Sequence, residues 1–152
     1  MIIYQGDAAG WGPIPGGSAV AIGVFDGVHR GHERVLEAVG RHDERYARVA
    51  MTFGTHPAAL LAVGPAPTRL STLKRRFELF EAAGIQRVAV LNFDAVLRDL
   101  TPDTFVERFL VAGLNARFVA VGEGFRFGRG ASGTTETLTE LGERHGFDVD
   151  VV

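Results

Sequence analysis

The sequence predicts a single α/β domain, built on one parallel sheet with helices on both faces. Two observations favour this fold class: strand and helix patterns alternate along the chain, and the strand segments are nearly continuous apolar runs, which is typical of strands buried on both faces. The length of 152 residues leaves room for one hydrophobic core. In a sheet of this kind we expect the ligand site at the carboxyl ends of the strands.

Each expected strand is a short run rich in apolar residues. Residues 1–17 are expected to form a lead-in with a possible edge strand at Ile2–Tyr4, and residues 18–152 the domain proper. The strands of that domain are expected at 19–24, 46–53, 86–93, 117–121 and 147–152.

Each expected helix shows apolar residues at helical spacing on one face. Thr101 and Pro102 supply an N-cap and a first helical residue, whereas Gly84 and Gly113 are suited to end helices. The basic run Lys74–Arg76 is interpreted as a solvated helix face. The helices are expected at 32–42, 71–83, 102–112 and 135–145.

Composition excludes several classes of protein. A net charge of −2 and a pI of about 6.2 give no basic field that would attract nucleic acid or an anionic membrane. The absence of cysteine excludes disulfides and thiolate chemistry, and the cytoplasm is the expected compartment. No apolar run approaches the roughly 18 residues of a membrane span, and the first 17 residues do not read as a signal peptide.

The first connection from strand to helix, residues 23–32, carries the first candidate site. Free backbone N–H groups and the helix dipole favour an anion there. His29 and His32 can face the same point, and Gly31 between them lets a phosphate approach the backbone closely. This arrangement suits nucleotidyl transfer, in which a nucleophile attacks the α-phosphorus of a nucleoside triphosphate and pyrophosphate leaves. Metal binding by the two histidines and ordinary structural roles at a helix start stay open as alternatives.

The same segment, Gly23-Val24-Phe25-Asp26-Gly27-Val28-His29-Arg30-Gly31-His32, resembles the HxGH motif of nucleotidyltransferases. Its form is that of bacterial FAD synthetases, the FMN adenylyltransferase module that is usually followed by riboflavin kinase. Two later segments, Thr52–Pro57 and Val121–Gly128, extend the resemblance, which covers residues 19–152. The resemblance implies a Rossmann-like fold that transfers AMP from Mg-ATP to FMN, giving FAD and pyrophosphate. Its partners would be these small nucleotides, with Mg²⁺ accompanying ATP.

The resemblance also assigns residues to the two substrates. His29 and His32 would be the catalytic residues and would contact the ATP phosphates. In an extended segment, Phe125 and Phe127 would share one side and Arg126 the other. The ATP site would comprise Gly23, Phe25, Asp26, Gly27, His29, Gly31 and His32, and the FMN site Thr52, His56, Pro57, Gly122, Phe125, Arg126, Phe127 and Gly128.

The sequence departs from the family pattern in three places. Gly54 and Thr55 stand where the family usually has an acidic residue and proline, and Gly124 stands where it has Asp or Asn. The family continues past a strand like 147–152 into a Ser-Ser-Thr-x-x-Arg segment and then a riboflavin kinase domain, neither of which is in this sequence. A fragment of a longer protein and a shortened relative both stay open. ATP binding weaker than that of a longer chain is expected, and a flavin- or nucleotide-binding module without catalysis is the alternative function.

A second glycine pattern favours a rival interpretation. Residues 128–133 match G-x-G-x-x-G, a helix is expected after them, and Asp148 and Asp150 lie about 20 residues on, as in dinucleotide-binding domains. The preceding strand, however, is expected to end near Val121, too far from Gly128 for the tight turn that this motif needs. NAD binding is therefore the weaker alternative.

Overall fold

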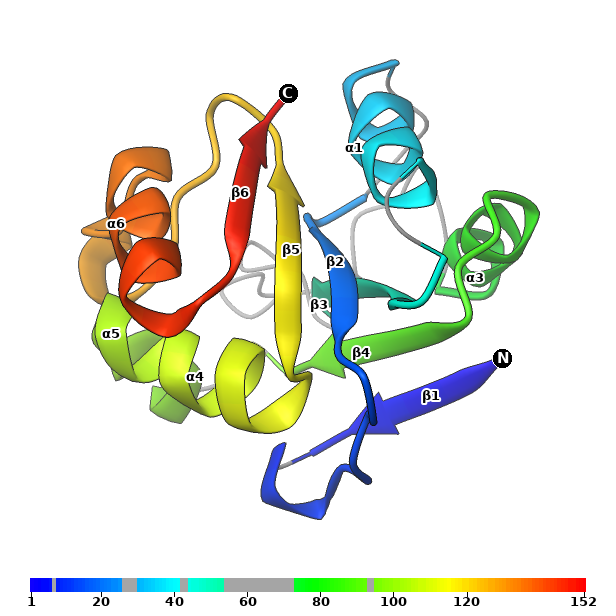
Figure 1. The fold of residues 1–152 in the computed structure, drawn as a ribbon. Coiled ribbons are helices and arrows are strands. Elements are labelled where there is room, and N and C mark those ends of the chain that lie inside the picture. Colours follow the sequence, from blue (N-terminus) through cyan, green and yellow to red (C-terminus); the bar gives the residue numbers. More distant parts are fainter. Residues whose placement is uncertain (7, 26–29, 42–43, 54–72, 93–94) are drawn as a thin grey trace, which may run out of the picture.

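The computed structural model describes residues 1–6, 8–25, 30–41, 44–53, 73–92 and 95–152. These residues form one six-stranded sheet in the order β1-β4-β3-β2-β5-β6, and every neighbouring pair is parallel (Figure 1). The predicted α/β fold with a Rossmann-like parallel sheet is confirmed. The strands are β1 (Ile2–Gln5), β2 (Ser18–Ile22), β3 (Ala47–Phe53), β4 (Arg87–Leu91), β5 (Ala116–Val121) and β6 (Asp148–Val151).

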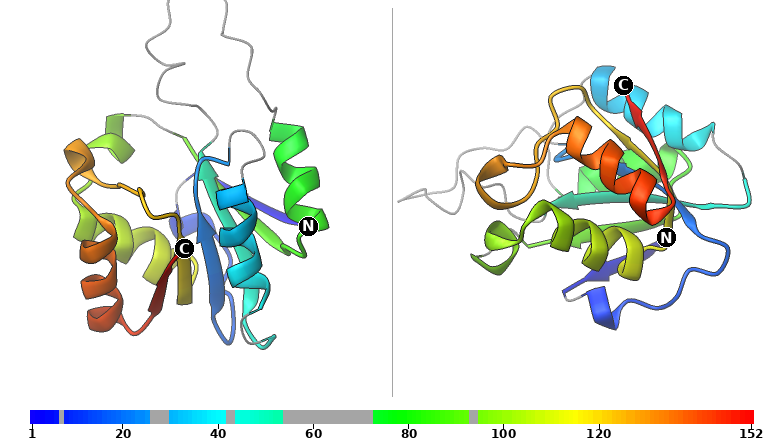
Figure 2. Two further views of the ribbon diagram at one scale, coloured as in Figure 1. Left: turned by 90° about the horizontal axis from the view of Figure 1, so that it is seen from above. Right: turned by 60° about the vertical axis from the view of Figure 1, so that its left-hand side comes forward.

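Helices cover both faces of the sheet, as predicted. Helices α1 and α3 lie on one side, and α5, η2 and α6 lie on the other (Figures 1 and 2). None of the described helices combines the length and apolar character that crossing a membrane requires. The α-helices are α1 (Arg30–Gly40), α3 (Leu73–Ala82), α4 (Ala95–Asp99), α5 (Pro102–Phe105) and α6 (Thr135–His145); η2 (Val106–Gly113) is a π-helix, and η1 (Ala8–Gly10) and η3 (Arg129–Ala131) are 3₁₀ turns.

The two faces of the sheet carry cores of different character. In β2, Ala19 and Ala21 point to the core under α1 and α3, whereas Val20 and Ile22 point to the core under η2 and α6. All four are at most 2% exposed, so this central strand is buried on both faces. The small alanine side chains let α1 pack close to the sheet, and the larger core on the other face is filled with aromatic and branched side chains.

The first 17 residues pack onto the larger core. The expected edge strand is confirmed as β1, in which Ile2 lies opposite Arg87 of β4. Trp11 is 9% exposed, and its indole nitrogen donates a hydrogen bond to the Gln5 carbonyl at 3.1 Å. Its ring covers Gly113, where an added Cβ would lie only 3.0 Å from the ring. The lead-in thus shares the hydrophobic core of the residues that follow it.

Helix boundaries follow the capping signals where these are strong. Helix α6 spans the predicted residues because Thr134 and Thr137 form a reciprocal cap at its start and Gly146, at φ +86°, ends it. The helix predicted at 102–112 is present, but after Val106 it continues with π-helical hydrogen bonding. Helix α4 was not predicted, because five residues are too few to show a periodic pattern.

Candidate active site

The carboxyl ends of β2, β3 and β5 meet at one edge of the sheet, where the candidate site was expected. Helix α1 begins at Arg30, so His32 lies in its first turn, beside N–H groups that have no intrahelical acceptor. The half-buried imidazole packs against the edge of the Phe25 ring, with centroids 5.3 Å apart and planes at 63°. His32 therefore combines an imidazole with the positive end of a helix dipole, which suits an anionic ligand.

Part of the predicted site lies outside the described residues. The placement of the predicted site residues outside the described ranges stays a prediction. So does the meeting of the His29 and His32 imidazoles at one point. Gly31 is the second residue of α1, as expected for a residue between two histidines at a helix start. The site residues outside the described ranges are Asp26, Gly27, His29, His56 and Pro57.

Phe25 has a backbone conformation that is uncommon for a residue with a side chain. Its φ is +53°, and its ring is only 4% exposed. The ring packs edge-on against Phe80 of α3, at a centroid distance of 5.1 Å. It also lies over Gly23, where an added Cβ would be 3.2 Å from the ring. Phe25 is thus a wall of the site that neighbouring side chains hold in place.

The first cavity at this edge, which we call the His32 cavity, has a volume of about 480 Å³. Its walls come from the β2–α1 connection and from the segment after β5, so it brings together residues that the sequence assigned to different substrates. The predicted residues that line it are Gly23, Phe25, His32, Gly122 and Phe125.

The second cavity, the Arg126 cavity, has a volume of about 350 Å³. Arg126 is an exposed cation on its rim, and the predicted residues Phe127 and Gly128 also line it. The Phe125 and Phe127 rings stack at 5.5 Å with planes 11° apart, as expected for side chains on one side of their segment, although Phe127 lines this cavity together with Arg126. Lining residues that were not predicted include Phe53, Leu97 and Phe105.

The two cavities lie on either side of the same two segments. Gly23 and Phe25 line the His32 cavity, whereas Val24 between them lines the Arg126 cavity. In the same way, Phe125 lines the first cavity and Arg126 the second. The β2–α1 connection and the segment after β5 therefore contribute walls to both cavities.

The structure buries Thr52, one of the residues predicted for the flavin side. Its side chain is fully buried, and its hydroxyl donates a hydrogen bond to the Val24 carbonyl at 2.8 Å. Thr52 thus ties the end of β3 to the β2–α1 connection and lines neither the His32 cavity nor the Arg126 cavity.

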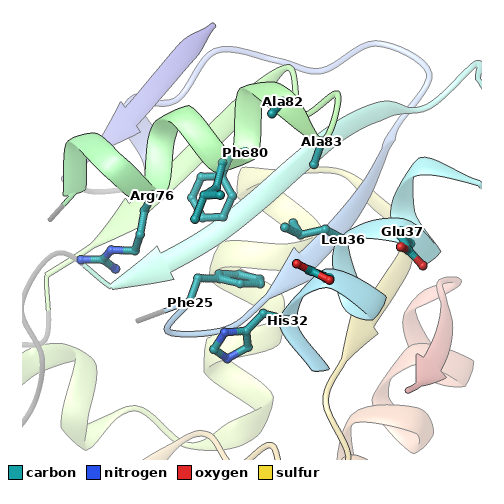
Figure 3. Close-up of a pocket in the computed structure, with 10 residues that line it drawn as sticks. Phe25, His32, Leu36, Glu37, Arg76, Phe80, Ala82 and Ala83 are labelled. Carbon is teal, nitrogen blue, oxygen red and sulfur yellow. The ribbon is translucent and has the colours of Figure 1, made fainter. Parts of the chain in front are cut away.

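The prediction that Arg76 belongs to a solvated basic face is wrong. Arg76 is 2% exposed, and its Nη1 atom donates hydrogen bonds to the carbonyls of Val24 and Phe53, both at 3.0 Å, and to the Thr52 hydroxyl at 2.9 Å. It also lines a third cavity of about 320 Å³ between α1 and α3, which shares Phe25 and His32 with the His32 cavity (Figure 3). Arg75, its neighbour, is exposed, as the sequence suggested.

The glycine pattern at 128–133 does not have the geometry of a dinucleotide-binding loop. Strand β5 ends at Val121, and Phe127 and Gly133 then exchange backbone hydrogen bonds of 3.1 and 2.8 Å. These bonds close the segment into a loop of its own before α6 begins. The described residues also contain no group of three or more His, Cys, Asp or Glu side chains that could hold a metal ion.

Replacing Gly128 by alanine is expected to lower the free energy of unfolding by about 1–3 kcal/mol. Its φ is +77°, and an added Cβ would lie 2.8 Å from the Pro102 ring and 2.9 Å from the Pro102 nitrogen. Urea unfolding followed by circular dichroism measures the effect. Gly124→Ala is the matched control, because a Cβ there meets nothing within 4 Å, and a change within about 0.5 kcal/mol is expected. Equal losses for the two variants would contradict the steric argument.

The likeness to a solved structure supports the fold alone. That structure is the crystal structure of a protein from Streptococcus pneumoniae described as a macrolide-efflux protein, with a TM-score of 0.83 and 23% sequence identity. The match covers all of this chain and 50% of the other chain.

Comparison of sequences places the chain more narrowly. Curated relatives described as bifunctional riboflavin kinase/FMN adenylyltransferase are 36% identical over 137 residues in Escherichia coli K12 and 34% identical over 136 residues in Haemophilus influenzae. These matches cover 88% of this chain but only 43% and 44% of the relatives, so the chain spans less than half of their length. The family model for FAD synthetase matches residues 13–152, which confirms the resemblance seen in the sequence. The chain therefore belongs to the FAD synthetase family.

Proposed function

We propose that this chain is an FMN adenylyltransferase, which transfers AMP from Mg-ATP to FMN and releases FAD and pyrophosphate. The observation that carries the proposal is the pair of cavities on either side of residues 23–25 and 125–126, in a member of the FAD synthetase family. A reaction between two nucleotides needs two neighbouring sites whose reacting phosphates can meet.

The proposed chemistry needs charge stabilisation more than proton transfer. A phosphate oxygen of FMN attacks the α-phosphorus of ATP, the bond from that phosphorus to the bridging oxygen breaks, and pyrophosphate leaves with the electron pair. The nucleophile is already an anion, so no general base is required. His32 and the N–H groups at the start of α1 would donate hydrogen bonds to the phosphates, and His29 is the proposed second donor. Mg²⁺ enters as part of the Mg-ATP substrate and neutralises charge on the leaving pyrophosphate.

The cavities suggest how the substrates divide between them. The His32 cavity suits ATP, because it contains the helix start and the imidazole. The Arg126 cavity suits FMN, since a guanidinium on its rim can bind a phosphate while Phe53, Phe105 and Phe127 offer apolar walls to an isoalloxazine ring. Gly122 and Phe125, which were assigned to FMN, line the His32 cavity and are proposed to lie where the two substrates meet. The cytoplasmic compartment stays a prediction.

Incubation of the chain with FMN, ATP and Mg²⁺ tests the proposal. FAD, separated by chromatography and detected by fluorescence, and pyrophosphate are expected to appear in equal amounts. Riboflavin in place of FMN is the matched control and is expected to give no FAD, because it lacks the phosphate that attacks ATP. Binding of both nucleotides by calorimetry without any product would instead indicate a binding module, and the absence of binding would contradict the proposal altogether.

A further inference from the structure

We propose that Arg76 is a positioning residue that holds, from α3, the backbone segments that form walls of both cavities. The kinetic part of this inference rests on the proposed function, whereas its structural part does not. In the sequence, Arg76 differs from its basic neighbours only in its spacing, three residues after Leu73 and four before Phe80, which places it on the apolar face of the helix.

The first step of the argument is the reach of the side chain. Arg76 comes from α3, and Figure 3 shows its guanidinium extended toward the end of β3, away from Phe80 on the same helix. There Nη1 donates hydrogen bonds to the carbonyls of Val24 and Phe53. One buried cation thus joins α3, the end of β3 and the β2–α1 connection. Hydrogen bonds from a charged donor are stronger than those between neutral groups, so these bonds hold the three elements together more strongly than neutral ones would.

The second step concerns the Val24 carbonyl, which accepts from two donors. Arg76 approaches it at 3.0 Å and the Thr52 hydroxyl at 2.8 Å, and Arg76 also donates to that hydroxyl at 2.9 Å. The three groups form a closed triangle in which Thr52 is fully buried and Arg76 is 2% exposed. The position of the Val24 peptide is therefore fixed by Thr52 and Arg76, which line neither the His32 cavity nor the Arg126 cavity.

The third step leads from Val24 to His32. The residue after Val24 is Phe25, whose φ of +53° persists only where its surroundings hold it. The Phe25 ring in turn packs against His32 at 5.3 Å. Loss of the Arg76 junction frees the Val24 peptide, lets Phe25 relax to a negative φ, and removes the ring that orients His32.

The fourth step leads to the other cavity. Val24 and Phe53, whose carbonyls accept from Arg76, both line the Arg126 cavity. A residue that supports the wall of one cavity is expected to alter mainly the kinetics of the substrate bound there. Because Arg76 supports walls of both cavities, its loss is expected to impair the use of ATP and FMN together.

The test compares Arg76→Met with Arg76→Lys and with the control Arg75→Met, which removes the same charge from an exposed neighbour. The structural readout is the NMR signal of the His32 imidazole protons, assigned by its loss in His32→Ala. In Arg76→Met this signal is expected to move because the ring current of Phe25 changes, while the signal of His145 on α6 stays in place. The kinetic readout is kcat/KM for each nucleotide, expected to fall at least tenfold for both in Arg76→Met, to recover partly in Arg76→Lys and to change less than twofold in Arg75→Met.

Other results overturn the proposal. A folded Arg76→Met chain with an unmoved His32 signal refutes it, and so does a loss of kcat/KM confined to one nucleotide. If Arg76→Met does not fold, Arg76→Gln decides, because it keeps a polar donor at this buried position but loses the charge and the length of the guanidinium; an unmoved His32 signal in that variant also refutes the proposal. If the unaltered chain makes no FAD, the proposed function fails, and the His32 signal still decides whether Arg76 positions this site.

Discussion

Replacement of His32 by alanine is expected to lower the rate of FAD formation by roughly 100- to 1,000-fold, the usual cost of removing one donor to a developing negative charge. The first turn of α1 and its free N–H groups remain in the variant, so the loss measures the imidazole itself. Stability is expected to change by less than about 1 kcal/mol, because the imidazole is only half-buried and lies in the first turn of α1. Initial rates at saturating nucleotides and urea unfolding measure the two quantities.

His145→Ala is the matched control for this experiment. His145 lies at the end of α6, and its Nε2 atom is 3.9 Å from a carboxylate oxygen of Glu107, on the helices that cover the other face of the sheet. The same chemical change there is expected to leave the rate within twofold. Turnover by His32→Ala at more than a tenth of the original rate would remove His32 from the proposed catalytic residues.

Replacement of Phe105 by alanine is expected to lower the free energy of unfolding by about 3–5 kcal/mol, as found when large aromatic core residues are truncated. Phe105 is 3% exposed and packs between Phe109 and Phe127, at centroid distances of 5.4 and 5.7 Å. Domains of this size are stable by about 5–15 kcal/mol, so the variant should be close to unfolding at physiological temperature. Thermal and urea unfolding curves give the change.

The control for Phe105→Ala is Val96→Ala on the neighbouring helix α4. Val96 is 65% exposed, and its truncation is expected to change stability by less than about 0.5 kcal/mol. Phe105 also lines the Arg126 cavity, so weaker FMN binding should accompany the loss of stability. Similar unfolding curves for the two variants would show that the core under η2 and α6 is not packed as described.

Much of the fold could be predicted because local signals and burial agree. Central strands such as β2 are buried on both faces, and such strands appear in a sequence as unbroken apolar runs. The limits of α6 were predictable because Thr134 and Gly146 carry capping signals that depend on their own neighbours. The order of the strands was not predicted, since periodicity does not say which strands pair.

Site residues that belong to a sequence motif were predicted, whereas those that reach the site through tertiary packing were missed. His32 follows from its spacing in the sequence, whereas Phe53 and Phe105 reach the Arg126 cavity only through the packing of β3 and α5. Arg76 was misinterpreted for a related reason. Two of its acceptors are backbone carbonyls, of Val24 and Phe53, and a backbone carbonyl leaves no trace in the side-chain pattern.

The pairing of β1 with β4 has a consequence for biosynthesis. Ile2 has its partner at Arg87 in β4, and two other strands, β2 and β3, lie between β1 and β4 in the chain. Because β1 precedes β4 in the chain, it waits for β2, β3 and β4 to be translated before it can dock, and contacts so distant in sequence slow folding. During that interval Ile2 and Ile3, which are still 49% and 45% exposed in the finished fold, are available to chaperones or to other nascent chains.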